Sequence, residues 1–241
     1  MAPDDAAERT PGEPPGRPVR DGLLLAFAVG IVGIIFGVLA RSSGLSVAKT
    51  CALSLLVFTG ASQLAAVSVI DAGGAPATAL GSALMLAARN TLYGPVVARW
   101  FPDRPMAERL AVAQLIIDES TGMGAAQSDP AQQRKGFVSA GLGTYVFWNL
   151  GTLVGAVAGD VVGDLQQWGL DAAFPAVYVA MLAPHLRRRP GRISALIAAA
   201  IAIATVPFLP VGIPILASTL GAFGGAVLAA RRQAPNRPET P

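Results

Sequence analysis

One charged side chain lies inside the long apolar part of the sequence. Seven apolar stretches can be traced along the 241 residues, and the only formal charge within them is that of Arg89. A charged side chain near the centre of a membrane helix costs roughly 2.5–3.5 kcal/mol on insertion scales, so it needs a cavity or a carboxylate partner. The alternative is an arginine that snorkels to the surface about ten residues away, a long reach of about 15 Å along a helix. We therefore favour a functional Arg89.

A second polar group is expected at membrane depth within 50–70. Gln63 brings a carboxamide to the middle of this stretch, and Gly60 and Ser62 precede it closely. Small residues can form a packing face on which Gln63 bonds to a neighbouring helix. They can equally mark a broken helix whose freed backbone groups contact a solute. The sequence supports the two interpretations about equally.

Two adjacent acids, Asp118 and Glu119, follow a short apolar run. Such a pair usually ends a helix at the surface, but here it could also hold Arg89 or a transported ammonium group. The preceding stretch 106–118 is too short and too polar to span a bilayer. It either lies flat on the inner face or enters the membrane partway.

A glycine-rich helix is predicted at 137–159. Trp148 and Asn149 place polar groups within this apolar stretch. Glycines at 151, 155 and 159 recur every four residues and give a smooth face for close helix packing. We favour packing as the role of this segment.

The elements that must position these groups are membrane helices. Charged residues make up 14% of the chain and hydrophobic residues 53%, against roughly 25% charged in soluble domains. A bilayer core about 30 Å thick needs roughly 20 apolar residues in a helix, and soluble helices need a polar face. We therefore predict an all-α, polytopic membrane bundle. One domain at 22–230 should be flanked by a disordered tail at 1–21 and a cytoplasmic tail at 231–241. Within this domain we predict about seven transmembrane helices, at 22–40, 50–70, 75–98, 137–159, 172–186, 193–208 and 212–230.

The loops suggest an orientation in the cell membrane. Loops 71–74, 160–171 and 209–211 hold no Lys or Arg, whereas 99–109 and 187–192 hold several. The positive-inside rule places the second group in the cytoplasm. Seven crossings then put the C-terminus in the cytoplasm and the N-terminus outside, and a crossing by 106–125 would reverse the N-terminal side. The 19 residues of 22–40 exceed the usual 7–15 of a signal-peptide core, so we expect this helix to be retained.

The sequence lacks the motifs of several classes of protein. The chain has no Gly-x4-Gly-Lys-Ser/Thr loop for ATP, and no His-Glu-x2-His or Gly-x-Ser-x-Gly pattern of a hydrolase. A single Cys51 and a single His185 support neither a disulfide nor a catalytic triad, so we expect no enzyme, metal or cofactor. The net charge of +3 is explained by topology rather than by nucleic-acid binding. A solute transporter remains, with a channel or a non-transporting scaffold as the alternative.

Five motifs resemble those of the AzlC family. The resemblance runs in order from about residue 20 to residue 230. The motifs are 58–63 (FTGASQ), 88–94 (ARNTLYG), 115–120 (LIIDES), 148–152 (WNLGT) and the supporting 169–174 (GLDAAF).

This resemblance implies the large subunit of a two-component exporter of branched-chain amino acids. It implies export of leucine, isoleucine and valine, with methionine as a further candidate, driven by the proton motive force. It also implies a small AzlD-type membrane partner of about four helices, while a homo-oligomer and another small solute stay open. The family motifs carry over Gln63, Arg89, Asn90, Tyr93, Asp118 and Glu119 as candidates for the transport path, and the polar positions above add Gly60, Ser62, Trp148 and Asn149.

An amino acid is a zwitterion, which suggests roles for these candidates. Arg89 or an unwound helix start at 60–63 could hold the carboxylate. Asp118, Glu119 or carbonyls near Gly60 could accept from the ammonium group. Apolar side chains would take the aliphatic part, and Glu119 or Asp118 would couple transport to protons.

Overall fold

The computed structural model describes residues 17–162, 189–210 and 213–219, together with Ala176, Val179, Leu182, Ala183 and His185–Arg187. Within these residues every regular element is a helix, which confirms the all-α prediction. The tail at 231–241, the motif at 169–174 and most of 1–21, 172–186 and 212–230 lie outside the described residues. The count of seven crossings therefore stays a prediction.

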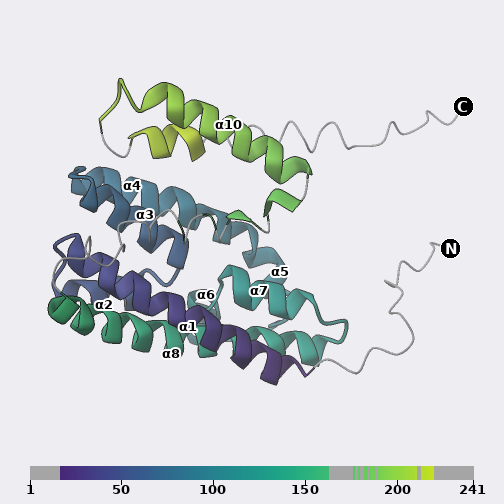
Figure 1. Ribbon diagram of the computed structural model, residues 1–241. Helices are drawn as coiled ribbons and strands as arrows, with labels where there is room; N and C mark the ends of the chain where they lie inside the picture. Colours follow the sequence, from purple (N-terminus) through teal and green to yellow (C-terminus); the bar gives the residue numbers. More distant parts are fainter. Residues whose placement is uncertain are drawn as a thin grey trace, which may run out of the picture.

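Two long helices form the base of the bundle (Figure 1). Helix α1, Pro18–Ser42, and helix α8, Pro130–Val162, are 25 and 33 residues long, and both contain a segment apolar enough to cross a membrane. They run in the same direction, because Ser139 Oγ donates to the Pro18 carbonyl at 3.1 Å and Gly159 lies against Arg41. We call the end at Pro18 and Pro130 the first end of the bundle, and the end at Arg41 and Gly159 the second end.

Glycines let the backbones of α1 and α8 approach each other. A Cβ atom at Gly155 would overlap the carbonyl of Ile34, and one at Gly151 would overlap the carbonyl of Gly30. Any larger residue there would push the two backbones apart. The predicted packing role of the glycines in 137–159 is thereby confirmed.

The outer faces of these two helices are apolar. Only 39% of the most apolar window of α1 and 44% of that of α8 is buried. A core helix of a soluble protein would hide such a face, whereas a membrane helix presents it to lipid. Large exposed side chains recur at helical spacing: Leu24, Phe27, Ile31 and Ile34 on α1, and Leu142, Val146, Leu150, Leu153 and Val157 on α8.

The predicted span 50–70 is a hairpin of two half-length helices. Helix α2, Val47–Leu56, has 10 residues and helix α3, Gly60–Asp71, has 12, or about 15 and 18 Å, roughly half of a bilayer core each. Ser43 Oγ donates to the Asp71 carboxylate at 3.0 Å, so the hairpin starts and finishes at the second end. The break considered for 60–63 lies instead at 57–59, and residues 60–63 form the first turn of α3. The chain returns where a crossing was expected.

The next segment crosses the bundle with an interruption. Helix α4, Pro76–Ala87, continues into a 3₁₀ turn, η1, Ala88–Leu92, and then into helix α5, Gly94–Ala98. Pro95 has no N–H to bond the carbonyl four residues earlier, so a regular α-helix cannot run through this point. The segment finishes at the first end, where the ring of Trp100 packs against Phe137 of α8.

The stretch 106–125 forms a second hairpin, which enters from the first end. Helix α6, Met106–Gln114, and helix α7, Asp118–Ala125, have nine and eight residues. Leu115, between them, lies against Gly141 of α8, and Gly124 lies back at the first end against the Trp100 ring. The structure therefore shows a hairpin that turns back at 115–117 and returns to the first end of the bundle.

This arrangement corrects the predicted topology. The sequence-based count made 22–40 and 137–159 run in opposite directions, which is wrong for the parallel helices α1 and α8. The error arises because 50–70 turns back at half depth, which removes one crossing between the two helices. The start of α1 therefore lies on the same side as 99–136.

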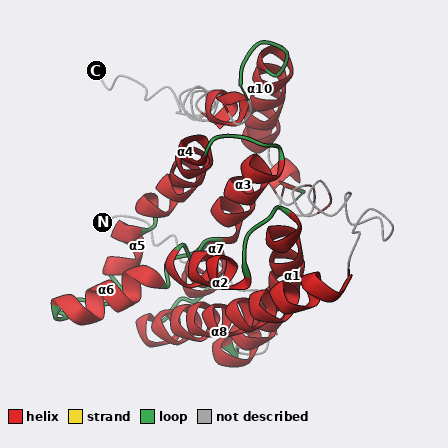
Figure 2. Cartoon of the chain, turned by 90° about the vertical axis from the view of Figure 1, so that its left-hand side faces the viewer, coloured by secondary structure: helices red, strands yellow, loops and turns green. Residues whose placement is uncertain are grey.

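A further layer covers the face of α3 and α4 that points away from α1 and α8 (Figure 2). It contains helix α10, Arg189–Thr205, and the helical residues 213–219. Ile215 packs against the cluster formed by Ala66, Val69, Ala79 and Ala83 of α3 and α4.

Candidate functional site

The tip of the α2–α3 hairpin is held by one buried carboxamide. Gln63 is fully buried, and its Nε2 donates to the Val57 carbonyl at 2.6 Å and lies 3.4 Å from the Leu53 and Ser54 carbonyls. These carbonyls belong to the last turn and cap of α2. The Leu53 carbonyl also accepts from the Val57 N–H at 2.9 Å, and the Val57 carbonyl from the Thr59 N–H at 2.6 Å. Gln63 therefore adds side-chain hydrogen bonds that tie the end of α2 to α3 across the break.

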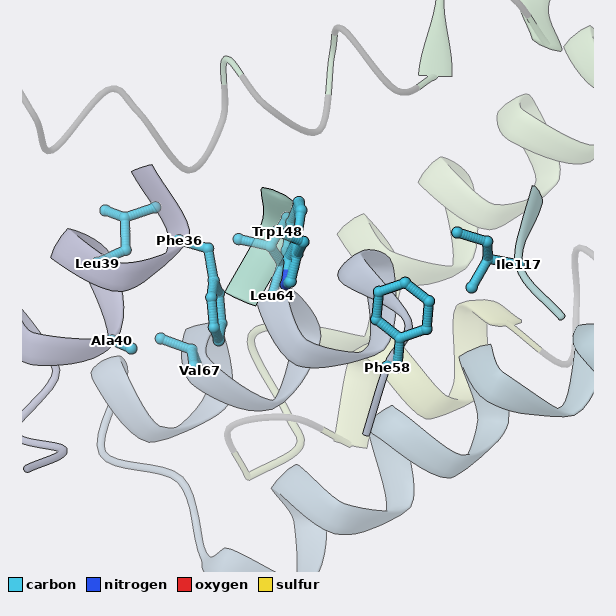
Figure 3. Close-up of a cluster of buried hydrophobic side chains, with 8 residues drawn as sticks. All are labelled: Phe36, Leu39, Ala40, Phe58, Leu64, Val67, Ile117 and Trp148. Atoms are coloured by element: carbon cyan, nitrogen blue, oxygen red, sulfur yellow. The ribbon is translucent and has the colours of Figure 1, made fainter. Parts of the chain in front are cut away.

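Trp148 of α8 completes this neutral network. Its Nε1 donates to Gln63 Oε1 at 2.9 Å, and its ring stacks on Phe36 of α1 with centroids 5.8 Å apart. The same ring lies against Gly60, where a Cβ atom would stand 3.0 Å from Cη2. Figure 3 shows Trp148 between Phe36 and Phe58 in the apolar cluster around the tip. The absence of a Cβ atom at Gly60 therefore allows the close approach of the Trp148 ring.

The tip of the α6–α7 hairpin is held by its own backbone and by a hydroxyl. Ile117 is extended, with φ −132° and ψ 173°, and its N–H donates to Ser120 Oγ at 3.1 Å. Ser120 is fully buried. This capping arrangement starts α7 at Asp118 and places two carboxylates in its first turn, where the helix dipole favours negative charge.

The carboxylate of Asp118 joins this tip to the interruption in the α4–α5 segment. Arg89 Nη2 lies 2.6 Å from Asp118 Oδ2, and the Tyr93 hydroxyl donates to Asp118 Oδ1 at 2.8 Å. Arg89 lies in the 3₁₀ turn and Tyr93 directly follows it. Asn90, in the same turn, donates to the Ile116 carbonyl at 3.2 Å. Arg89 thus has the carboxylate partner that its depth requires, and both oxygens of Asp118 are engaged.

A cavity of about 110 Å³ lies between the two hairpin tips. One part of its wall is ionic, from Arg89, Asp118 and Glu119, and the start of α3 contributes backbone amides that no side chain caps. The rest is mostly apolar. The apolar and hydroxyl-bearing lining residues are Val29, Val32, Phe58, Thr59, Ala61, Leu64, Ile117, Thr144 and Trp148.

The structure therefore brings most of the predicted site residues together. Gly60, Arg89, Asp118, Glu119 and Trp148 line the cavity itself. Gln63, Asn90 and Tyr93 touch the lining residues or the tips without being part of the wall.

Two further predicted residues, Ser62 and Asn149, also lie outside the cavity wall. Ser62 is fully buried in α3, and Asn149 donates to the Tyr145 carbonyl one turn earlier in its own helix, at 2.7 Å.

Sequence reasoning missed two hydroxyl groups in the cavity wall. Thr59 immediately precedes α3, and Thr144 lies one helical turn before Trp148 on α8. The spacing of four residues between Thr144 and Trp148 places both on one helix face, and this signal could have identified Thr144.

Metal-binding groups do not gather in the part of the chain that the structure describes. No three His, Cys, Asp or Glu side chains there lie close enough to hold a metal ion. The ionic part of the cavity can instead bind a small charged solute through one cation, two carboxylates and a helix start.

The comparisons with known proteins match membrane proteins, one of which is named as a transport protein. An "Uncharacterized membrane protein" of Archaeoglobus fulgidus is 27% identical over 177 residues, which cover 70% of this chain and 77% of that protein. The "Branched-chain amino acid transport protein AzlC" of Bacillus subtilis is 24% identical over 179 residues, covering 73% and 69%. No solved structure matches the chain. The sequence model of the family described as "AzlC protein" matches residues 25–162, which contain both hairpins and the cavity. The chain therefore belongs to the AzlC family of membrane transport proteins.

Proposed function

We propose that this protein exports branched-chain amino acids as the large subunit of a two-component exporter. The observation that carries the proposal is the cavity between the two hairpin tips, which combines a cation, two carboxylates and an apolar wall at half depth. The matched relative named as a branched-chain amino acid transport protein supports the same substrate class.

The ionic groups of the cavity suit a zwitterion. The substrate carboxylate would accept hydrogen bonds from Arg89 and from the first amides of α3, at the positive end of that helix. The substrate ammonium would donate to Asp118. Binding would then exchange the Arg89–Asp118 pair for two pairs with the substrate, so that no charge stays buried and unpaired.

The apolar wall suits a branched aliphatic side chain. Val29 and Val32 of α1, with Phe58 and Leu64 from the hairpin, provide its surface. An apolar wall of this kind distinguishes two substrates that differ by one methylene group by only about 1–3 kcal/mol of binding free energy. We therefore expect overlapping export of leucine, isoleucine and valine, with methionine as a weaker substrate.

Glu119 is our candidate for proton coupling. Asp118 has both oxygens engaged by Arg89 and Tyr93. Glu119 lines the same cavity and makes no ion pair with the described residues. A carboxylate without a fixed cation can gain and lose a proton as the site opens to each side.

We further propose that the first end of the bundle faces the cytoplasm. Arg41 and Lys49 are the basic residues near the second end. By the positive-inside rule, the N-terminus then lies in the cytoplasm, as the corrected topology requires. The basic residues that lie at or near the first end, between 17 and 136, are Arg17, Arg20, Arg99, Arg104, Arg109, Arg134 and Lys135.

Efflux from intact cells tests the proposed function. Cells that express this chain with its small AzlD-type partner are loaded with a leucine-containing dipeptide, and intracellular leucine is followed over time. We expect lower intracellular leucine than in cells with the empty vector, and loss of that difference when the membrane is depolarised by a protonophore. Equal leucine with and without the gene, at verified expression of both subunits, would leave the scaffold or another solute as the better interpretation.

A further inference from the structure

We infer that Thr144 is a substrate-binding residue, whose hydroxyl donates a hydrogen bond to the carboxylate of the transported amino acid. This inference rests on the proposed function and adds a ligand group that neither the family motifs nor the charged residues supply. Its basis is that Thr144 combines two features, a buried hydroxyl without a partner and a place among the residues that line the cavity.

Thr144 is buried, and its hydroxyl has no partner among the described residues. The residue is 2% exposed, and Oγ1 makes no hydrogen bond there. A threonine in a helix usually bonds the carbonyl three or four residues earlier. Thr205 does so with the Ile201 carbonyl at 2.7 Å, and Thr219 with the Ile215 carbonyl at 2.8 Å. Thr144, like Thr50 and Thr121, lacks this bond.

Thr144 differs from the other residues with unpaired hydroxyls in its location. Other buried hydroxyls without a partner, at Thr50, Ser62, Ser82 and Thr121, do not line the cavity between the tips, whereas Thr144 does. Leaving a buried hydroxyl unpaired is unfavourable, and of these five residues Thr144 alone lines this cavity, where a bound ligand could pair with its hydroxyl.

The ligand group is assigned by what the cavity already contains. Asp118 and Glu119 are acceptors for an ammonium group. Arg89 and the uncapped start of α3 are donors, and both are suited to a carboxylate. Thr144 adds a neutral donor to this second set. A carboxylate has about four lone-pair sites, so it can accept from all three.

Thr152 provides a matched control on the same helix. It lies two turns further along α8, is fully buried, and its hydroxyl accepts from Ser54 Oγ at 3.2 Å. Thr152 does not line the cavity. Replacing threonine by valine keeps the shape and removes the hydroxyl in both places, so the two variants separate ligand binding from structural bonding.

The test uses the two-subunit protein in proteoliposomes, with labelled leucine uptake measured over a range of concentrations. We expect Thr144→Val to raise the KM for leucine by on the order of 10-fold or more, with a much smaller change in the maximal rate. Thr144→Ser, which keeps the hydroxyl, should restore most of the affinity. Leucinamide, which lacks the carboxylate, should inhibit the wild type and Thr144→Val equally. The melting temperature of Thr144→Val should equal or exceed that of the wild type, because the variant removes an unpaired buried hydroxyl.

Two results would overturn the assignment while leaving the proposed function intact. One is an unchanged KM for leucine in Thr144→Val. The other is an equal rise in KM in Thr144→Val and Thr152→Val that follows a loss of thermal stability, which would make both hydroxyls structural. If the wild type with its partner moves no branched-chain amino acid, the proposed function fails and the Thr144 assignment fails with it.

Discussion

The two hairpins share a geometry but differ in what holds their tips. The α2–α3 tip is neutral and buried: Gln63 and Trp148 are 0% and 4% exposed, and eight of the 12 residues of α3 are buried. The α6–α7 tip is charged, with Asp118 and Arg89 side chains 36% and 37% exposed, and α6 has no buried residue. The first tip is neutral and enclosed by the bundle, whereas the second joins buried residues at the start of α7, Ile117 and Ser120, to a half-exposed ion pair and to the unburied α6. We therefore expect substrate binding to alter the position of α6–α7 more than that of α2–α3.

The largest predicted effect concerns the charged tip. Arg89→Ala or Asp118→Asn should lower leucine export by on the order of 100-fold, because each leaves one charge of the pair without its partner and removes a substrate contact. Export is measured as labelled leucine efflux at matched membrane expression. Arg104→Ala is the control, since its pair with Glu108 is an exposed surface contact at 3.1 Å, and it should have no effect.

A double variant separates a substrate role of this pair from a structural one. Arg89→Ala with Asp118→Ala removes both charges, so it should restore insertion and stability without restoring export. If the doubly neutral protein exported leucine normally, the ion pair would be structural and the proposed binding site would be wrong.

The next effect concerns the neutral tip, and it should appear in stability. Gln63→Leu leaves Trp148 Nε1 without a partner and removes one of the two hydrogen bonds that the Val57 carbonyl accepts, the other coming from the Thr59 N–H. At about 1–3 kcal/mol for an unsatisfied group, the melting temperature of the detergent-solubilised protein should fall by about 5–15 °C. Gln114→Leu removes an exposed bond to the Leu55 carbonyl at 3.2 Å and should change it little. Equal melting temperatures for the two variants would refute the distinction between a buried and a peripheral tip.

A smaller effect is expected at the second donor to Asp118. Tyr93→Phe removes the hydroxyl that donates at 2.8 Å and keeps the ring. Because Arg89 still holds the other oxygen, export should fall by only roughly 3- to 10-fold. The measurement is again the initial rate of leucine efflux, and a loss as large as that of Arg89→Ala would mean that Tyr93 contributes more than a supporting hydrogen bond.

The smallest predicted effect is on the melting temperature, when one glycine in each hairpin is replaced by alanine. Gly60→Ala places a Cβ atom 3.0 Å from the Trp148 ring, whereas Gly122→Ala in α7 meets no atom within 4 Å. The first should lower the melting temperature by about 2–4 °C, and the second should leave it unchanged or raise it slightly. A larger loss at Gly122 than at Gly60 would contradict the assignment of the α2–α3 tip as the tightly packed one.

The sequence predicted the polar residues of the site better than it predicted the path of the chain. Three polar side chains can be recognised in the sequence because burying them in apolar surroundings costs free energy: Arg89, Gln63 and Asp118. The structure gives each of them a specific partner. The return of 50–70 could not be predicted from its length, because two half-length helices and one full span have the same composition. The hairpin is stabilised by the buried hydrogen bonds of Gln63. One of these comes from Trp148, 85 positions further along the chain, which local sequence patterns do not reveal. Thr144 was missed because one hydroxyl in an apolar helix is unremarkable until its missing partner and its cavity are seen.

The side on which each hairpin starts and finishes tests the account most directly. Single cysteines at Ser43 and Ala72 flank α2–α3, and single cysteines at Asp103 and Ala126 flank α6–α7, in a chain whose native Cys51 is replaced by alanine. They are labelled in intact cells with a membrane-impermeant maleimide, before and after permeabilisation. Opposed hairpins predict that 43 and 72 react from one side of the membrane and 103 and 126 from the other. Labelling of 43 and 72 from opposite sides would show that 50–70 crosses the bilayer, and would contradict the cavity between two returning tips.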